Sequence, residues 1–358
     1  MERKDELILV INPGSTSTKV GVFEAERMTY SESFEHKASE LAAFHHITDQ
    51  LGLRKAAVEE ALLKSGTDRG SLAAVACRGG RFKPMASGTY AVNDRMIEDA
   101  KACLQGEHAS NLACMIGREI ADELGIKAYV TDPVSVDELD DVARVAGIKE
   151  IRRNSLSHAL NMKAMARRAA DELGKKYEDC RMVVAHMGGG GSVSAHAGGL
   201  MVDLNNCDKE GPFTAERAGG LPTLDLVALC YSGRYTHGQM IKKLVGGAGL
   251  MSHLGTKDAR EVERRIESGD KEAELVFRAM AYQVAKAIGG MSAVLSGKVD
   301  VIVITGGMAR SKRLLDEISS RVSFIAPVRA YPGEDELEAL AMGTLRVLRG
   351  EEEPKEYE

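Results

Sequence analysis

The pattern of apolar and polar positions predicts strands that alternate with helices along the whole chain. In the first 150 residues, strands are predicted at 8–12, 19–23, 72–77 and 128–131, and a helix at 109–124. A second cycle begins near residue 150, with strands at 181–186, 192–196 and 299–305 and helices at 157–173, 274–295 and 336–348. Short buried strands mixed with long helices are typical of α/β proteins. We therefore expect two α/β domains, and we expect the terminal stretch EEEPKEYE to fray.

The composition is that of a globular protein without a general affinity for nucleic acid. Of the 358 residues, 44% are hydrophobic and 28% are charged, and the net charge is -6 at pH 7. An acidic chain without a long basic run does not suit the phosphate backbone of DNA or RNA. The apolar runs are strand-sized, too short for a signal peptide or a membrane span, and the six cysteines form no CxxC pair. We expect a cytoplasmic protein with no membrane or nucleic-acid partner.

The first candidate site is the turn between the first two predicted strands, which reads LVINPGSTSTKV. Gly14 permits close backbone approach, so that several N–H groups can converge on anionic oxygens. Ser15 and Ser17 add hydroxyl donors to this turn, and Lys19 adds a positive charge. The amide of Asn12 lies where it can touch a transferring phosphoryl group. A plain hairpin, the alternative interpretation, does not need this density of polar groups.

Two further turns combine glycines with the end of a buried strand. The second reads AHMGGGGSVSA and contains Gly188, Gly189, Gly190 and Gly191. Four consecutive glycines are costly in backbone entropy, which indicates that something approaches this backbone closely. The third reads VIVITGGMARSKRL and contains Gly306, Gly307 and Met308; an ordinary strand-to-helix turn is the alternative there. None of the turns matches the GxxxxGK[ST] or the GxGxxG phosphate-binding pattern.

Together the three turns resemble the two phosphate motifs and the adenosine motif of the superfamily of acetate kinases, sugar kinases and actin. The opening NPGSTSTK is similar to that of acetate kinases, as are GEHASNL at 106–112 and NSLSHA at 154–159. The segment NNCDKEGPFTAERAGGLP at 205–222 most resembles the butyrate kinase branch. The resemblance implies two actin-like, ribonuclease H-like domains, residues 1–150 plus 337–358 and residues 151–336, with a nucleotide cleft between them.

The resemblance also implies roles for individual residues. Asn12, Ser15, Ser17 and Lys19 are expected near the β- and γ-phosphates, and the glycines of the second and third turns near the phosphates and the adenosine. Arg217 and His158 match catalytic residues, and His108 matches a residue of the acid site. Asp132 matches a catalytic aspartate near the metal. Glu336 is the best match for the Mg²⁺-site acid, although Glu334 and Asp335 are close enough to leave the register open.

One position departs from the family pattern. Acetate kinases carry an arginine three residues before a His-Gly-Gly sequence, and that column holds Val75 here. Arg78, which directly precedes Gly79 and Gly80, is expected to supply the same guanidinium to the substrate from a shifted place. The alternative is an arginine exposed at a strand end. For Arg217 the alternative is a loop arginine that pairs with Glu210 or Glu216.

By resemblance, the expected activity is reversible, ATP-dependent phosphorylation of butyrate to butyryl phosphate, with Mg²⁺ and ATP or ADP bound, in a homo-oligomer. One alternative is a sister enzyme that acts on a branched-chain acid, propionate or acetate, because one methylene is worth only about 1–3 kcal/mol of discrimination. Another alternative is a nucleotide-binding module without catalysis.

Overall fold

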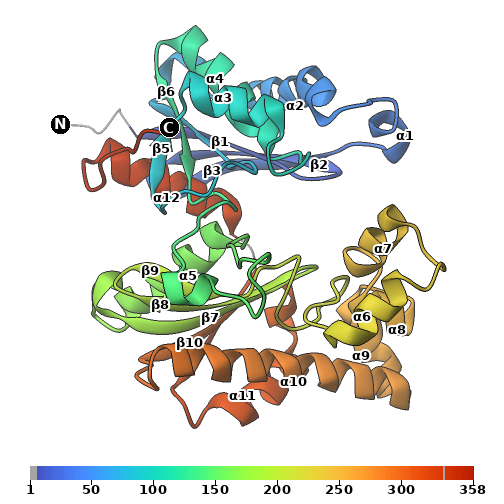
Figure 1. The fold of residues 1–358 in the computed structure, drawn as a ribbon. Coiled ribbons are helices and arrows are strands. Elements are labelled where there is room, and N and C mark those ends of the chain that lie inside the picture. The colour runs from blue at the N-terminus through green and yellow to red at the C-terminus, as the bar shows by residue number, and fades with distance from the viewer. Residues whose placement is uncertain (1–5, 334) are drawn as a thin grey trace. The chain divides into compact units, whose positions relative to one another are not determined.

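The computed structural model describes residues 6–333 and 335–358, which divide into two compact units. The first unit contains the described residues up to Val136 together with Asp335–Glu358, and the second contains Asp137 to Gly333. In Figure 1 the blue and cyan elements and the red helix α12 (Glu336–Leu348) belong to the first unit. The segment 137–150 belongs to the second unit, whereas the sequence pattern places the boundary near residue 150.

The first unit is built on a mixed sheet with the strand order β3-β2-β1-β4-β6-β5. The strands are β1 (Leu7–Pro13), β2 (Ser17–Glu24), β3 (Arg27–Glu35), β4 (Ala74–Cys77), β5 (Thr89–Ala91) and β6 (Lys127–Thr131). The predicted hairpin is confirmed, since β1 and β2 pair antiparallel with Asn12 opposite Lys19. The strands β4 and β6 run parallel to β1, so their carboxyl ends lie on the same side of the sheet as the turn after β1. Arg78 directly follows β4 and Asp132 directly follows β6, so both residues lie on that side.

Helices cover both faces of this sheet (Figure 1). They are α1 (Ala38–Leu41), α2 (Leu51–Ser65), α3 (Asp94–Ala102), α4 (Asn111–Leu124) and α12. Residues of α2 and α4 share a core with Leu9 and Ile11 of β1, whereas α12 packs on β1, β4 and β6. At Gly343 the approach is so close that a Cβ would lie 2.3 Å from Oγ1 of Thr131. The prediction of a helix at 336–348 is confirmed.

The C-terminal tail is packed into the first unit, and the expectation that it frays is wrong. Tyr357 is buried in the core, and its ring lies 5.5 Å, between centroids, from the ring of Phe82. Its hydroxyl donates to Asp99 at 2.9 Å, and the N–H of Lys355 donates to the carbonyl of Thr89 at 2.8 Å. A single aromatic side chain within a charged tail gives no periodic apolar signal, so the pattern did not reveal this anchor.

The second unit repeats the strand arrangement of the first. Its sheet has the order β11-β10-β7-β8-β9, formed by β7 (Arg181–Met187), β8 (Gly191–Ala197), β9 (Leu200–Leu204), β10 (Val301–Gly306) and β11 (Val328–Pro332). The antiparallel series β7-β8-β9 corresponds to β1-β2-β3, and the parallel neighbours β10 and β11 correspond to β4 and β6. The prediction that both halves offer a glycine turn between a first and a second strand is therefore confirmed.

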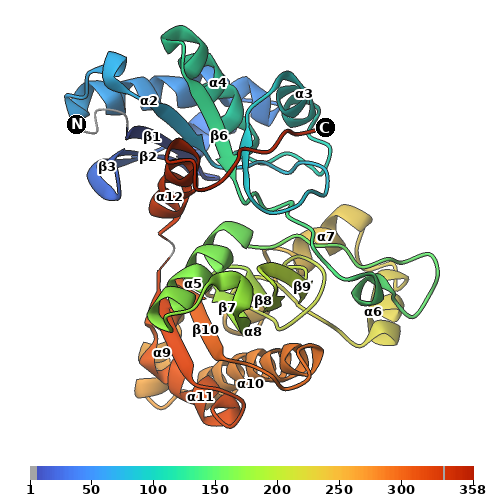
Figure 2. The ribbon, with the colours of Figure 1, turned by 90° about the vertical axis from the view of Figure 1, so that its left-hand side faces the viewer.

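Helices also cover both faces of the second sheet (Figure 2). On one face lies α5 (Ala159–Glu172), and on the other lie α10 (Lys271–Val294) and α11 (Lys312–Val322). The unit also contains the helices α6 (Thr223–Cys230), α7 (His237–Leu244), α8 (Gly249–Leu254) and α9 (Ala259–Glu267). Val183 and Ala185 of β7 point into a core shared with α10 and α11, whereas Met182 and Val184 point into one shared with α5. This alternation has the period of a strand buried on both faces. Within the described residues, no helix combines the length and apolar character needed to cross a membrane.

Candidate active site

The turn after β1 exposes N–H groups on one side and is held by an arginine on the other. The N–H of Gly14 donates to the carbonyl of Ser17 at 2.8 Å, which closes the turn. Ser15 and Thr16 are exposed, and within the described residues no acceptor bonds to their N–H groups. Arg54 of α2, which is fully buried, donates to the carbonyl oxygens of Gly14, Ser15 and Ser17. The turn therefore presents two exposed N–H groups, and their binding to an anion stays a prediction.

Three residues predicted separately meet beside this turn. Asn12 is the buried next-to-last residue of β1, Arg78 follows β4, and Glu336 begins α12. Nδ2 of Asn12 donates to Oε2 of Glu336 at 2.7 Å, and Nη1 of Arg78 donates to Oδ1 of Asn12 at 3.1 Å. Arg78 also forms an ion pair with Glu336. Arg78 is therefore not a strand-end arginine in solvent, since its side chain is only 22% exposed.

The neighbouring acidic positions differ from Glu336. Asp335 is exposed and lies at the start of α12, and Glu334 lies outside the described residues. Lys19 lies opposite Asn12 in the hairpin, which puts both side chains on the same face of the sheet, but Lys19 is exposed. Of the acidic residues that the structure describes here, Glu336 is the one with contacts to Asn12 and Arg78.

Asp132 and His108 occupy two other places in the first unit. Asp132 is buried with φ at 40°, and its Oδ1 accepts a hydrogen bond from the N–H of Gly88 at 2.8 Å. His108 is half-buried before α4, and its Nδ1 lies 3.2 Å from the N–H of Ser110. Because a peptide N–H can only donate, Nδ1 accepts there, and a neutral ring then carries its proton on Nε2.

In the second unit, the glycine run forms a tight turn between β7 and β8. The N–H of Gly188 donates to the carbonyl of Gly190 at 2.9 Å, and Oγ1 of Thr214 donates to the carbonyl of Gly189 at 2.6 Å. A Cβ at Gly191 would lie 2.7 Å from Cγ2 of Thr214. Contacts within the protein therefore account for part of this glycine run, and the close approach to a ligand stays a prediction for the rest.

His158 lies next to this turn, at the residue before α5. A Cβ at Gly190 would lie 3.7 Å from Nε2 of His158, so the imidazole borders the glycine run directly. Nδ1 of His158 forms a hydrogen bond with Oγ of Ser192 at 3.0 Å. The ring stacks on that of His186, with centroids 4.0 Å apart and an interplanar angle of 8°. His186, for which the sequence indicated only a part in shaping the turn, is in turn bonded to Asn161 at 2.8 Å.

Arg217 is held by two carboxylates. Its Nε donates to Oδ1 of Asp208 at 3.2 Å, and its Nη1 donates to Oε1 of Glu216 at 2.9 Å. Lys257 forms a second ion pair with Glu216, at 3.0 Å. Burial opposes the charge of Glu216, but the hydrogen bonds from Lys257 and Arg217 outweigh it and hold its pKa below the ordinary value. Glu210, the other partner considered from the sequence, pairs with Arg153 instead.

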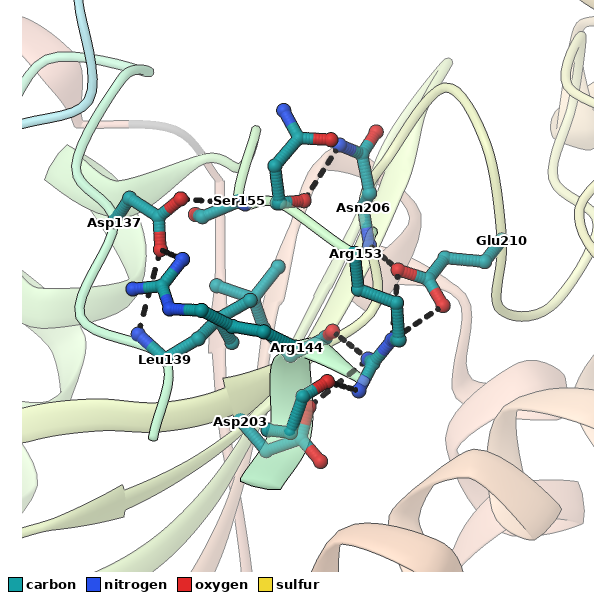
Figure 3. A network of polar contacts seen from close by, with 11 residues as sticks. Asp137, Leu139, Arg144, Arg153, Ser155, Asp203, Asn206 and Glu210 are labelled. Carbon is teal, nitrogen blue, oxygen red and sulfur yellow. Dashed lines mark hydrogen bonds and ion pairs between the residues drawn. The ribbon is translucent and has the colours of Figure 1, made fainter. Parts of the chain in front are cut away.

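A network around Arg153 connects the segments that carry His158 and Asp208 (Figure 3). Arg153 pairs with Asp203 at 2.9 Å and with Glu210 at 3.0 Å, and it donates to the carbonyl of Leu204 at 2.7 Å. Asp208 lies in the loop between these two acidic residues. The network therefore ties residues 153–158 to the loop that orients the guanidinium of Arg217.

Two of the three predicted turns border one cavity in the second unit. The cavity has a volume of about 670 Å³ and is lined by Gly188, Gly189, Gly307 and Met308. Gly306 has φ at 91°, and a Cβ there would lie 2.3 Å from the carbonyl oxygen of Met187, so only glycine fits. Charged side chains also line the cavity, namely Glu216, Lys257, Asp258, Arg260, Glu263 and Arg310. Ligand pockets for molecules of nucleotide size have volumes in this range.

The sequence did not point to Arg54, Lys257 or the stacking role of His186. Arg54 and Lys55 are adjacent basic residues of one helix, and nothing in the pattern separates the fully buried one from the partly exposed one. Lys257 opens a charged segment of the sequence, and such segments are typical of a solvated helical face. The available signal was the position of Lys257, directly before the N-cap Asp258 of α9. Helix N-termini favour anions, so a basic residue at such a place can indicate an anion-binding site.

The comparisons with known proteins agree with this arrangement. The model of the Acetokinase family matches residues 143–322. The crystal structure of Porphyromonas gingivalis acetate kinase has a TM-score of 0.78 and 20% identity, over 96% of this chain and 100% of that chain. A propionate kinase from Francisella tularensis has a TM-score of 0.73 and 18% identity, over 94% and 98%. A ROK hexokinase from Thermus thermophilus has a TM-score of 0.50 and 14% identity, over 95% and 98%. The predicted class, two α/β domains of the acetate and sugar kinase type, is confirmed.

Proposed function

The chain belongs to the acetokinase family of carboxylate kinases, and on this premise we propose that it phosphorylates butyrate with ATP to give butyryl phosphate and ADP. The observation that carries the phosphotransfer is the shared cavity of the second unit, where Gly188, Gly189 and Gly307 of two separate turns meet. The choice of butyrate rests on the segment 205–222, which resembles the butyrate kinase branch.

The main obstacle to the reaction is the electrostatic repulsion between the carboxylate and the triphosphate, not the transfer of a proton. A fatty acid titrates near the pKa of a glutamate side chain, about 4.3, so it is already ionised at neutral pH and needs no general base. Two unit charges 4 Å apart repel by about 4 kcal/mol at an effective dielectric of 20. The enzyme must therefore place cations and aligned donors around both anions, which is the usual logic of phosphoryl transfer.

Arg217 and His158 provide this compensation in the second unit. Asp208 and Glu216 fix two edges of the Arg217 guanidinium, while its Nη2 has no acceptor in the described part of the chain. That group can donate to an equatorial oxygen of the transferring phosphoryl. The His158 ring, oriented by its bond to Ser192, borders the glycine turn with Nε2. The side chains of the cavity, with Met308 as an apolar wall, would hold the adenosine.

The first unit supplies a second set of groups. The exposed N–H groups of Ser15 and Thr16 and the side chain of Lys19 would bind the β- and γ-phosphates. The amide of Asn12 would donate to the transferring group, and Arg78 would neutralise the carboxylate of the acid. His108, which matches a residue of the acid site, would help to orient that carboxylate.

The residues fit a Mg²⁺ ion that arrives with the nucleotide. In kinase sites Mg²⁺ keeps several waters and takes one or two carboxylates plus substrate phosphates as ligands. Oε2 of Glu336 accepts from Asn12 and Arg78, whereas Oε1 has no donor among the described residues. Glu336 would therefore hold the ion through Oε1, with Asp132 proposed as the second acid. The metal would neutralise charge on the phosphates, as it does in other kinases.

A panel of acids tests the proposal. The purified protein is incubated with MgATP and acetate, propionate, butyrate, isobutyrate or isovalerate, and acyl phosphate is trapped with hydroxylamine as the hydroxamate. We expect the highest kcat/KM with butyrate. A maximum with acetate or propionate would assign the chain to a sister activity, and no hydroxamate from any acid despite ATP binding would reduce it to a nucleotide-binding module.

A further inference from the structure

Arg54 is a fully buried cation whose partners are all neutral. The residue lies in the first turn of α2, and its side chain is the largest of the fully buried ones. Its Nε and Nη2 donate to Oε1 of Gln50 at 3.1 and 2.9 Å. Within the described residues it forms no ion pair with a carboxylate. A buried charge without a counter-ion is costly, so it is retained only where something compensates it.

All five N–H groups of the guanidinium are used, and most of them hold one turn. Nη1 donates to the carbonyl oxygens of Gly14 and Ser17, both at 2.9 Å, and lies 3.3 Å from Oγ1 of Thr18. Nη2 donates to the carbonyl of Ser15 at 3.2 Å. The planar fork of arginine can address three carbonyls at once, whereas the ammonium of lysine is a point charge.

Because Arg54 binds the carbonyl groups on one side of the turn 14–17, the N–H groups of the same peptide units point to the opposite side. In a trans peptide the C=O of one residue and the N–H of the next point in opposite directions. The carbonyls of Gly14 and Ser15 point to Arg54, so the N–H groups of Ser15 and Thr16 point away from it. These are the two exposed N–H groups for which the described residues provide no acceptor. The guanidinium thus polarises two peptide units in the direction that favours an anion on the outer side of the turn.

We propose that Arg54 is a positioning residue for the nucleotide: it presets the turn 14–17 for the phosphates of ATP and acts as their counter-cation through two peptide units. The proposal rests on the proposed function only in naming ATP as the anion. The bound phosphate completes the charge balance that the protein leaves open around Arg54. Affinity for the nucleotide should therefore depend on this side chain, although it lies on the opposite side of the turn from the ligand.

The lowered pKa of the neighbouring His36 is consistent with a permanent positive charge on Arg54. Nε2 of His36 lies 2.8 Å from Oγ1 of Thr18, the hydroxyl that Arg54 also contacts. Burial, and secondly the charge of Arg54, lower the pKa of His36, while Glu40 and Glu35 act in the opposite direction to a smaller extent. His36 is therefore neutral at pH 7, so that of these two side chains Arg54 alone carries a positive charge behind the turn.

Chemical rescue separates this role from a purely structural one. Arg54→Ala leaves room for ethylguanidinium, which restores the planar fork, and ethylammonium is the matched control with charge but no fork. We expect Arg54→Ala to raise the Kd for MgADP, measured by calorimetry, and the KM for ATP by about tenfold or more. The KM for the acid should change little. Ethylguanidinium should recover most of the ADP affinity, and ethylammonium should not.

Two further variants distinguish a specific loss of ADP affinity from a failure of the protein to fold. Arg54→Lys keeps the charge and the bulk, and we expect a smaller loss of ADP affinity with a far-ultraviolet circular dichroism spectrum like that of the wild type. Lys55→Met changes the adjacent residue, whose ammonium pairs with Glu119 and Glu123 on the surface, and should leave ADP affinity unchanged. Wild-type ADP affinity in folded Arg54→Ala or Arg54→Lys would overturn the inference. Because the readout is nucleotide binding, it stands even if no acid is phosphorylated.

Discussion

Arg78 pairs with Glu336 across 258 residues of sequence, and Asn12 bonds to both. The three side chains come from β1, from the residue after β4 and from the start of α12. Their contacts join a cation, a carboxylate and an amide before any substrate is present. Such preorganisation removes part of the cost of orienting charged groups during the reaction.

The first prediction concerns the metal. Glu336→Gln keeps the size of the side chain and its contact with Asn12 but removes the charge that we assign to Mg²⁺. We expect kcat to fall by about 100-fold or more, as for the loss of one strong charge stabiliser, and the Mg²⁺ concentration for half-maximal rate to rise. The rate is measured against free Mg²⁺ at fixed ATP. Glu338→Gln, at an exposed position of the same helix, serves as the control. An unchanged Mg²⁺ dependence would exclude Glu336 as the metal ligand.

The second prediction concerns Arg217. Arg217→Met leaves Asp208 and Glu216 in place but removes the Nη2 group that we propose as a donor to the transferring phosphoryl. We expect kcat to fall by about 100- to 1000-fold, the usual effect of losing one transition-state donor, while ADP affinity stays within a few-fold. Arg234→Met, an exposed arginine of the same unit, is the control. Near-normal turnover of Arg217→Met would remove this residue from the chemistry.

The third prediction concerns acid stability. His196 is fully buried between the hydroxyls of Tyr177 and Ser194, at 2.7 and 2.6 Å, and burial lowers its pKa well below 6.5. The charges of Lys163 and Arg167 lower it further. The folded state therefore keeps His196 neutral, whereas the unfolded chain gains a proton below about pH 6.5. Stability must fall as the pH drops below that value.

The size of this effect can be measured by urea unfolding at pH 7.5 and 5.5. Replacing His196 by Gln should reduce the loss of unfolding free energy between these two pH values by about 1 kcal/mol. His45→Asn, at an exposed site, should leave the loss unchanged. An equal loss in His196→Gln and the wild type would show that His196 is protonated in the folded state.

The fourth prediction concerns the C-terminal anchor. Tyr357→Ala removes a buried ring that packs on Phe82 and a hydroxyl bonded to Asp99. We expect a loss of about 3–5 kcal/mol in unfolding free energy, as for other buried aromatic truncations. Tyr231→Ala, with a side chain 88% exposed, should change it by less than about 0.5 kcal/mol. Equal urea midpoints for the two variants would contradict the packing of the tail.

The sequence located the strands on either side of both glycine turns and four of the long helices, but it did not locate β3, α2 or the helices α6 to α9. It was also insufficient for the contacts between the elements. Apolar periodicity located β1, β2, α10 and α12 because each of these buries a regular face. The resemblance placed Asn12, Arg78 and Glu336 near one reaction, and the structure shows that they touch. Arg54 could not be found this way, because its burial depends on the carbonyls of a turn some forty positions earlier in the chain. Likewise, the tail is held by one tyrosine, too little for a periodic signal.

The central claim is that a carboxylate oxygen of the acid, and not water, accepts the γ-phosphoryl group of ATP. It is tested most directly with butyrate labelled with ¹⁸O in both carboxylate oxygens. The acyl phosphate is cleaved by hydroxylamine at its carbonyl carbon, and the released phosphate is analysed by mass spectrometry. We predict one ¹⁸O atom per phosphate, formed only when butyrate, ATP and enzyme are all present. Phosphate without ¹⁸O, released at the same rate with or without butyrate, would show that water is the acceptor and would contradict the claim.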